Sequence, residues 1–179
     1  MRDLLEILTA MAAQKDKVKD RLELLLDMGD RLVKTITQEF SCKQDEVAIL
    51  LLSSDGRHLR FVAPRRFCDL GSIPVTKRDS IAVGVLSRRT GEVTNNVPMV
   101  RHVAFFESIK LRDKPAPIQK MVTAPLLVRG QAIGVAQISR KGDNAREAGP
   151  DFTPADLRRA QELLDSVAPF FAEARPSPY

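Results

Sequence analysis

Metal-binding and stacking side chains are scarce in this chain of 179 residues. It holds two cysteines, two histidines, one tyrosine and no tryptophan, and aromatic residues make up 5% of it. Cys42, Cys68, His58 and His102 contain no pair at the spacing of zinc ligands. So few rings disfavour the stacking platforms that bind single-stranded nucleic acid. We therefore expect no metal, no cofactor and no nucleic-acid partner.

Long apolar runs and long basic runs are also lacking. No stretch approaches the roughly 20 apolar residues that span a membrane. Asp3 and Glu6 interrupt the apolar N-terminal part, which is not typical of a secretory signal. The net charge is +5, but the lysines and arginines form scattered pairs rather than one cluster. These features predict a cytoplasmic protein with reduced thiols and no membrane contact.

Apolar residues recur through the first forty positions at alternating steps of three and four, the heptad spacing of a coiled coil. We predict one long helix over residues 1–40 as a dimerisation arm, then a domain over 41–175 and a tail over 176–179. An amphipathic helix lying on its own domain would show the same spacing. The seam positions, of which all but the lysine and the glycine are apolar, are Leu4, Leu8, Met11, Lys15, Val18, Leu22, Leu25, Gly29, Leu32 and Ile36.

The period changes after the arm. Residues 47–52 and 57–63 are short segments on either side of Asp55-Gly56, and such a pair between two apolar segments predicts a β-hairpin. Residues 80–90 have helical periodicity with a serine at the start, which predicts a short capped helix.

A second hairpin is predicted from residues 122–128 and 132–139, which flank Arg129-Gly130. Gly134 lies in the middle of its second strand. Because glycine has no Cβ, a helix or a ligand could approach the strand closely there, so we predict a contact position. A β-bulge is the alternative explanation.

The chain closes with a second helical seam. Thr153, Pro154 and Asp156 form a start like a capping box. Pro169 should kink this helix or end its regular part. The apolar positions again alternate by three and four: Leu157, Ala160, Leu164, Val167, Phe171 and Ala174.

Three segments in this order, at residues 86–93, 123–138 and 152–157, resemble the motifs of the GAF domain family. The resemblance covers about residues 20–173. It implies an α/β (α+β) fold with a central antiparallel sheet of five or six strands. It also implies N- and C-terminal helices on one face of the sheet, and a ligand pocket or loops on the other.

The long irregular connection between residues 95 and 120 is where we expect a ligand to bind. Its cation and imidazole would suit a carboxylate or a phosphate, whereas its two phenylalanines would equally serve to fill the pocket. The candidate ligand-binding residues are Asn95, Asn96, Arg101, His102, Phe105, Phe106 and Gly134.

The resemblance implies a non-catalytic sensing and regulatory module. We expect it to act as a homodimer that responds to a small molecule or to a downstream signalling protein. The predicted dimer contacts come from both seams: Leu8, Met11, Val18, Leu22, Leu25, Leu164, Val167 and Phe171.

Two other functions stay open at this point. Some relatives in the family reduce free methionine sulfoxide through pocket cysteines. Cys68 would be the nucleophile here, with its pKa lowered by Arg65 and Arg66. The other alternative is a purely structural dimerisation domain with a closed pocket.

Overall fold

Six strands form one antiparallel sheet in the order β3-β2-β1-β6-β5-β4. The structure, a computed structural model, describes residues 2–14, 20–99, 116–177 and 179. The expected central antiparallel sheet of five or six strands is confirmed. The strands are β1 (Val47–Leu52), β2 (His58–Ala63), β3 (Ser72–Pro74), β4 (Glu92–Thr94), β5 (Ile118–Val128) and β6 (Gln131–Lys141).

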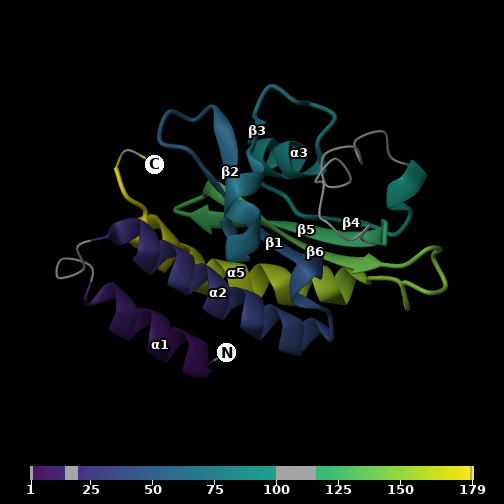
Figure 1. Ribbon diagram of the computed structural model, residues 1–179, viewed down its shortest axis with the longest axis horizontal. Helices are drawn as coiled ribbons and strands as arrows, with labels where there is room; N and C mark the ends of the chain where they lie inside the picture. The colour runs from purple at the N-terminus through teal and green to yellow at the C-terminus, as the bar shows by residue number, and fades with distance from the viewer. Residues whose placement is uncertain (1, 15–19, 100–115, 178) are drawn as a thin grey trace.

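Helices cover the sheet unequally (Figure 1). α1 (Arg2–Ala12), α2 (Arg21–Phe40) and α5 (Pro154–Ala174) lie on one side, and α3 (Ile81–Arg88) lies on the other. The larger apolar core is formed by this side of the sheet together with α1, α2 and α5. A smaller core joins the opposite face to α3 and to the 3-10 turn η2 (Arg65–Leu70). Two further 3-10 turns are η1 (Gln44–Glu46) and η3 (Val97–Met99).

The prediction of one helix over residues 1–40 is wrong. α1 ends at Ala12, and a separate helix, α2, begins at Arg21. Asp20 caps α2, because its Oδ1 accepts hydrogen bonds from the backbone N–H groups of Leu22 at 2.9 Å and Glu23 at 3.3 Å. Such a cap satisfies amides that a continuous helix would have bonded to its preceding turn. α1 lies beside α2 in Figure 1, so the seam is divided between two packed helices.

Most of the predicted dimer contacts lie in the core of the single chain. Leu8, Leu25, Leu164, Val167 and Phe171 are at most 1% exposed and belong to the larger core. We therefore assign these five to the monomer rather than to a dimer interface, which fits the alternative of helices lying on their own domain.

The remaining predicted contacts differ from those five. Met11 is half-buried, Leu22 is 42% exposed, and Val18 lies outside the described residues. Homodimer formation itself stays a prediction.

Local signals in the sequence located several elements. Both hairpins form, across Asp55-Gly56 and Arg129-Gly130, and Thr153 with Asp156 makes the capping box of α5. α5 does not end at Pro169, because it continues to Ala174.

The neighbouring strand explains why a glycine occupies position 134. A Cβ there would collide with the carbonyl oxygen of Leu50 and lie 2.7 Å from the Leu51 Cδ2. Gly134 is paired with both Leu51 of β1 and Leu126 of β5, and the pairing of β5 with β6 shifts register just beyond Leu126. The close approach at Gly134 is therefore made by β1, and no ligand is needed to account for it.

We expect Gly134→Ala to lower the free energy of unfolding by about 1–3 kcal/mol or more, because backbone cannot yield to the added methyl group. The matched control is Gly84→Ala in α3, where the nearest atom to a Cβ is the flexible guanidinium of Arg88 at 2.9 Å. That control should be neutral, or stabilising by up to about 1 kcal/mol. Urea unfolding of both variants measures the difference, and equal stabilities would contradict the packing described for β1 and β6.

A second prediction concerns a buried and an exposed position of the N-terminal seam. Leu8→Ala should lower the free energy of unfolding by about 2–5 kcal/mol, since Leu8 is fully buried. Leu22→Ala should change it by less than about 0.5 kcal/mol. Urea midpoints measured at low and high protein concentration provide the test. If the loss in Leu8→Ala arose at a dimer interface, the wild-type midpoint would rise with concentration.

Candidate functional site

Buried polar side chains occupy the centre of the sheet face opposite α1, α2 and α5. Thr123 of β5 is fully buried, and Gln137 and Ser139 of β6 are each 4% exposed. Gln137 is paired with Thr123 across the two strands. Side chains alternate between the two faces of a strand, so Ala136 and Ile138 point to the large core while these polar groups point away from it. A purely structural sheet would usually bury apolar residues here.

A small cavity adjoins these groups. It is about 10 Å³ in volume, which leaves room for roughly one water molecule. β5, β6, β1, η1 and η2 all contribute to its wall. The wall residues are Asp45, Glu46, Val47, Ala48, Phe67, Ile118, Met121, Gln137 and Ser139.

The amide of Gln137 is satisfied at one end and not at the other. Its Nε2 donates to the Met121 Sδ at 3.1 Å and lies 3.4 Å from the Thr123 Oγ1. A thioether sulfur can accept a hydrogen bond but cannot donate one, so the orientation with the amide nitrogen toward Met121 is the one that makes both contacts. The Gln137 Oε1 is buried and has no hydrogen-bond partner. Leaving such an oxygen unpaired costs about 1–3 kcal/mol, so it requires an explanation.

Two carboxylates of η1 form the next part of the wall. Both oxygens of Glu46 are occupied, because they accept from the backbone N–H groups of Lys43 and Lys141, each at 2.8 Å. Asp45 lies 3.1 Å from the Lys141 Nζ. Partial burial works to raise the pKa of Asp45, but the hydrogen bond and charge of Lys141 lower it overall. Asp45 is therefore ionised at neutral pH, and both carboxylates on this side of the cavity are paired within the chain.

Of the residues predicted from the sequence to bind a ligand, the three that the structure describes, Asn95, Asn96 and Gly134, are not among the residues of this wall. Arg101, His102, Phe105 and Phe106 lie outside the described residues, and Asn96 is exposed.

Asn95 has a structural role instead. Its Nδ2 donates to the Phe152 carbonyl and its Oδ1 accepts from the Phe152 N–H, both at 2.9 Å. Both ends of its amide therefore fasten the end of β4 to the approach of α5.

Sequence reasoning missed Gln137, Ser139 and Glu46. A signal was present for the first two, since polar residues alternate with Ala136 and Ile138 in a strand of apolar character. No such signal exists for Glu46, because only tertiary pairing brings η1 to the end of β6.

Cys68 lies at a different, larger cavity of about 570 Å³, among residues of α2, β2, η2 and the C-terminal end. Burial raises the pKa of Cys68, and the charges of Asp69 and Asp30 raise it further, while Arg65 lowers it less. The expectation that Arg65 and Arg66 would give a low-pKa thiol is therefore wrong. Burial also raises the pKa of Cys42 to about 11, so neither cysteine is activated.

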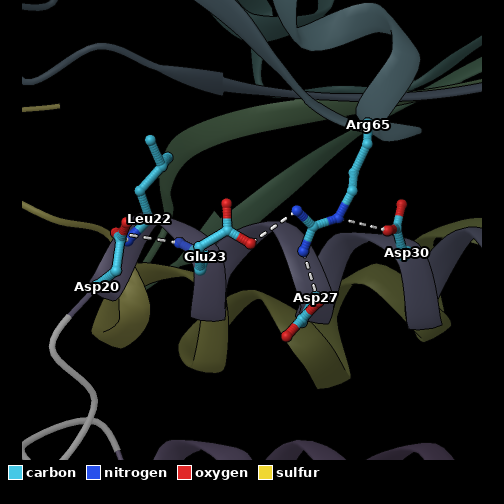
Figure 2. A network of polar contacts seen from close by, with 6 residues as sticks. All are labelled: Asp20, Leu22, Glu23, Asp27, Asp30 and Arg65. Atoms are coloured by element: carbon cyan, nitrogen blue, oxygen red, sulfur yellow. Dashed lines mark hydrogen bonds and ion pairs between the residues drawn. The ribbon is translucent and has the colours of Figure 1, made fainter.

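Arg65 is held by carboxylates rather than by the thiol. Figure 2 shows it reaching from η2 to one face of α2. Its Nη1 lies 2.8 Å from Glu23, its Nη2 2.5 Å from Asp27 and its Nε 3.0 Å from Asp30. Residues spaced by three or four lie on the same side of a helix, so a single guanidinium can contact all three. Two positions after Arg65, Phe67 lines the small cavity, and η2 thus connects that cavity with α2.

Within residues 2–14, 20–99, 116–177 and 179, no three His, Cys, Asp or Glu side chains gather closely enough to hold a metal ion. No helix in these ranges is long and apolar enough to cross a membrane.

The family model for the GAF domain matches residues 25–169. The match spans most of the chain, so the protein belongs to the GAF domain family. GAF domains are generally small-molecule sensing and regulatory modules. No curated protein sequence matches the chain.

Solved structures with the same fold come from signalling proteins and from enzymes. The GAF domain of a phosphoenolpyruvate-protein phosphotransferase from Acinetobacter has 16% identity and a TM-score of 0.64, over 95% of this chain and 93% of that one. The GAF domain of the Coxiella burnetii phosphotransferase has 14% identity and a TM-score of 0.65, over 96% and 94%. The type II free methionine-R-sulfoxide reductase of Thermoplasma acidophilum has 17% identity and a TM-score of 0.62, over 86% and 96%.

We expect Cys68 to react slowly with iodoacetamide at neutral pH in a Cys42→Ser background. The thiolate is the nucleophile, and a raised pKa leaves less of it at a given pH than in glutathione. Asp69→Asn removes a charge that raises the pKa, so alkylation near pH 8 should become faster. Rates measured against pH test both statements. A rate already at its plateau at pH 7 would contradict them.

Proposed function

We propose that this chain is a non-catalytic sensing module that binds a small molecule at the polar face of its sheet. The observation that carries the proposal is the buried, unpaired Gln137 Oε1. A buried polar group without a partner requires an explanation, and a functional role is one of those available. The other sheet face is filled by apolar helices, so the polar groups beside the smaller apolar core are the place left for binding.

Ligand binding would reach α2 through η2. Phe67 touches the cavity, and Arg65 holds three carboxylates of α2 from the same turn. A ligand that moves Phe67 would therefore shift the Arg65 contacts. A change of this kind follows only if the ligand binds one arrangement of η2 more tightly than the other.

We further propose that the module works in the cytoplasm as a homodimer and passes its signal to a downstream protein. Because the buried parts of both seams serve the monomer, the dimer would use the outer helix surfaces. Ile7 of α1 and Leu22 of α2 are 37% and 42% exposed and are the large apolar side chains available there.

The sulfoxide reductase alternative has less support. Reductases share the fold, but the Cys68 thiol has a raised pKa and lies at another cavity, away from Gln137. Turnover of free methionine sulfoxide that disappears in Cys68→Ser would establish the enzyme and overturn the sensing proposal.

Native mass spectrometry tests the sensing proposal directly. The chain purified under non-denaturing conditions is expected to carry a small molecule that Gln137→Leu does not retain. The matched control is Gln119→Leu, because Gln119 is a buried glutamine of β5 whose Nε2 donates to the Gly142 carbonyl at 2.8 Å. This control should keep the molecule. Absence of any bound molecule, together with a crystal structure whose cavity is filled by the chain's own side chains, would instead establish a closed structural unit.

A further inference from the structure

The described walls of the small cavity present hydrogen-bond acceptors and few free donors. The Gln137 Oε1 is unpaired, while the Met121 sulfur and the Asp45 carboxylate already accept from the Gln137 Nε2 and the Lys141 Nζ. The one hydroxyl, that of Ser139, already donates to the Glu46 carbonyl at 2.9 Å. No lysine or arginine is among the residues that the structure places in this wall.

The size of the cavity limits what can enter it. Room for about one water molecule admits a single terminal group such as –OH, –NH₂ or –NH₃⁺. A carboxylate or phosphate has several oxygens, and each of them would face an acceptor. Such an anion would also find no free cation in the described wall, because Lys141 is already paired with Asp45.

We propose that the ligand of this site presents a hydrogen-bond donor, an amine, amide or hydroxyl group, to the Gln137 Oε1. The proposal rests on the proposed function, and it replaces the anion expected from Arg101 and His102 with a neutral or cationic group. Pairing of the oxygen removes the cost of leaving it buried and unbonded. The site would bind a ligand with a donor here more tightly than a ligand of the same shape with an acceptor. The acceptor would leave the Gln137 Oε1 unpaired.

The side-chain amide of Gln137 gives a direct readout. In ¹H–¹⁵N correlation spectra of the labelled chain, its NH₂ pair of signals is assigned by its loss in Gln137→Met. Three probes of one carbon skeleton are titrated: butyramide, butylammonium and butyrate. The first two should shift this pair saturably, and butyrate should not. The NH₂ pair of Gln119, on the adjacent strand, is the internal control and should stay in place.

Two variants sharpen the test. Gln137→Met removes the acceptor, and because both variants lack the side-chain NH₂ pair, binding to them is followed by the backbone N–H signal of residue 137. We expect butyramide affinity to fall roughly tenfold in Gln137→Met, the loss of one hydrogen bond. Gln137→Glu keeps the acceptor and adds a negative charge. It should bind butylammonium more tightly and butyrate no better. The second variant keeps the test decisive if the first does not fold.

Each other outcome overturns the proposal. If butyrate shifts the Gln137 pair as strongly as butyramide does, the ligand group is an anion rather than a hydrogen-bond donor. The proposed sensing site itself would then be retained. Retention of a water on the Gln137 Oε1 in a butyramide-soaked crystal would show that water alone satisfies it. No shift with any probe, while native mass spectrometry finds a bound molecule, would place that molecule elsewhere. If no bound molecule is found either, the proposed function fails as well.

Discussion

The structure depends on the side-to-side alternation of β6, the strand between β1 and β5. Its even-numbered residues Ala136 and Ile138 join the large core, and its odd-numbered residues Gln137 and Ser139 face the other way. A slip of one residue would put the amide into the apolar core and expose the apolar pair. Register is therefore strongly specified, and Gly134 reinforces it because a residue with a Cβ would not fit against β1.

The apolar side of this sheet accounts for most of the helical sequence. α2 and α5 pack against the strands, α1 packs against α2 and α5, and most of the described apolar positions of both seams supply the contacts. Folding α1 back beside α2 buries Leu4 and Leu8 within one chain, so no second chain is needed to cover them. The two faces of the sheet therefore differ. One is closed by apolar packing, and the other retains polar groups beneath its cover.

The sequence predicted the elements whose signals are local. Such signals involve residues that are close together in the sequence: the turn residues of both hairpins, the Thr153 cap and the family motifs. The structure confirms the elements that they predicted. The heptad spacing predicted most of the buried helix positions, Leu22 excepted, but not what buries them, since seams between chains and within a chain look alike. The pKa of Cys68 could not be anticipated, because burial and Asp30 of α2 act on it only after folding. The candidate site was sought in a loop, while Gln137 lies in a strand.

The polar face and the helical layer are joined through η2. Its Phe67 lines the cavity, and its Arg65 contacts three acidic side chains on α2 (Figure 2). The sensing account depends on the unpaired oxygen of Gln137. A crystal structure at atomic resolution would test it most directly. The account predicts that the donor within hydrogen-bond distance of the Gln137 Oε1 belongs to a bound small molecule. A donor supplied by a side chain or backbone N–H of this same chain would contradict it.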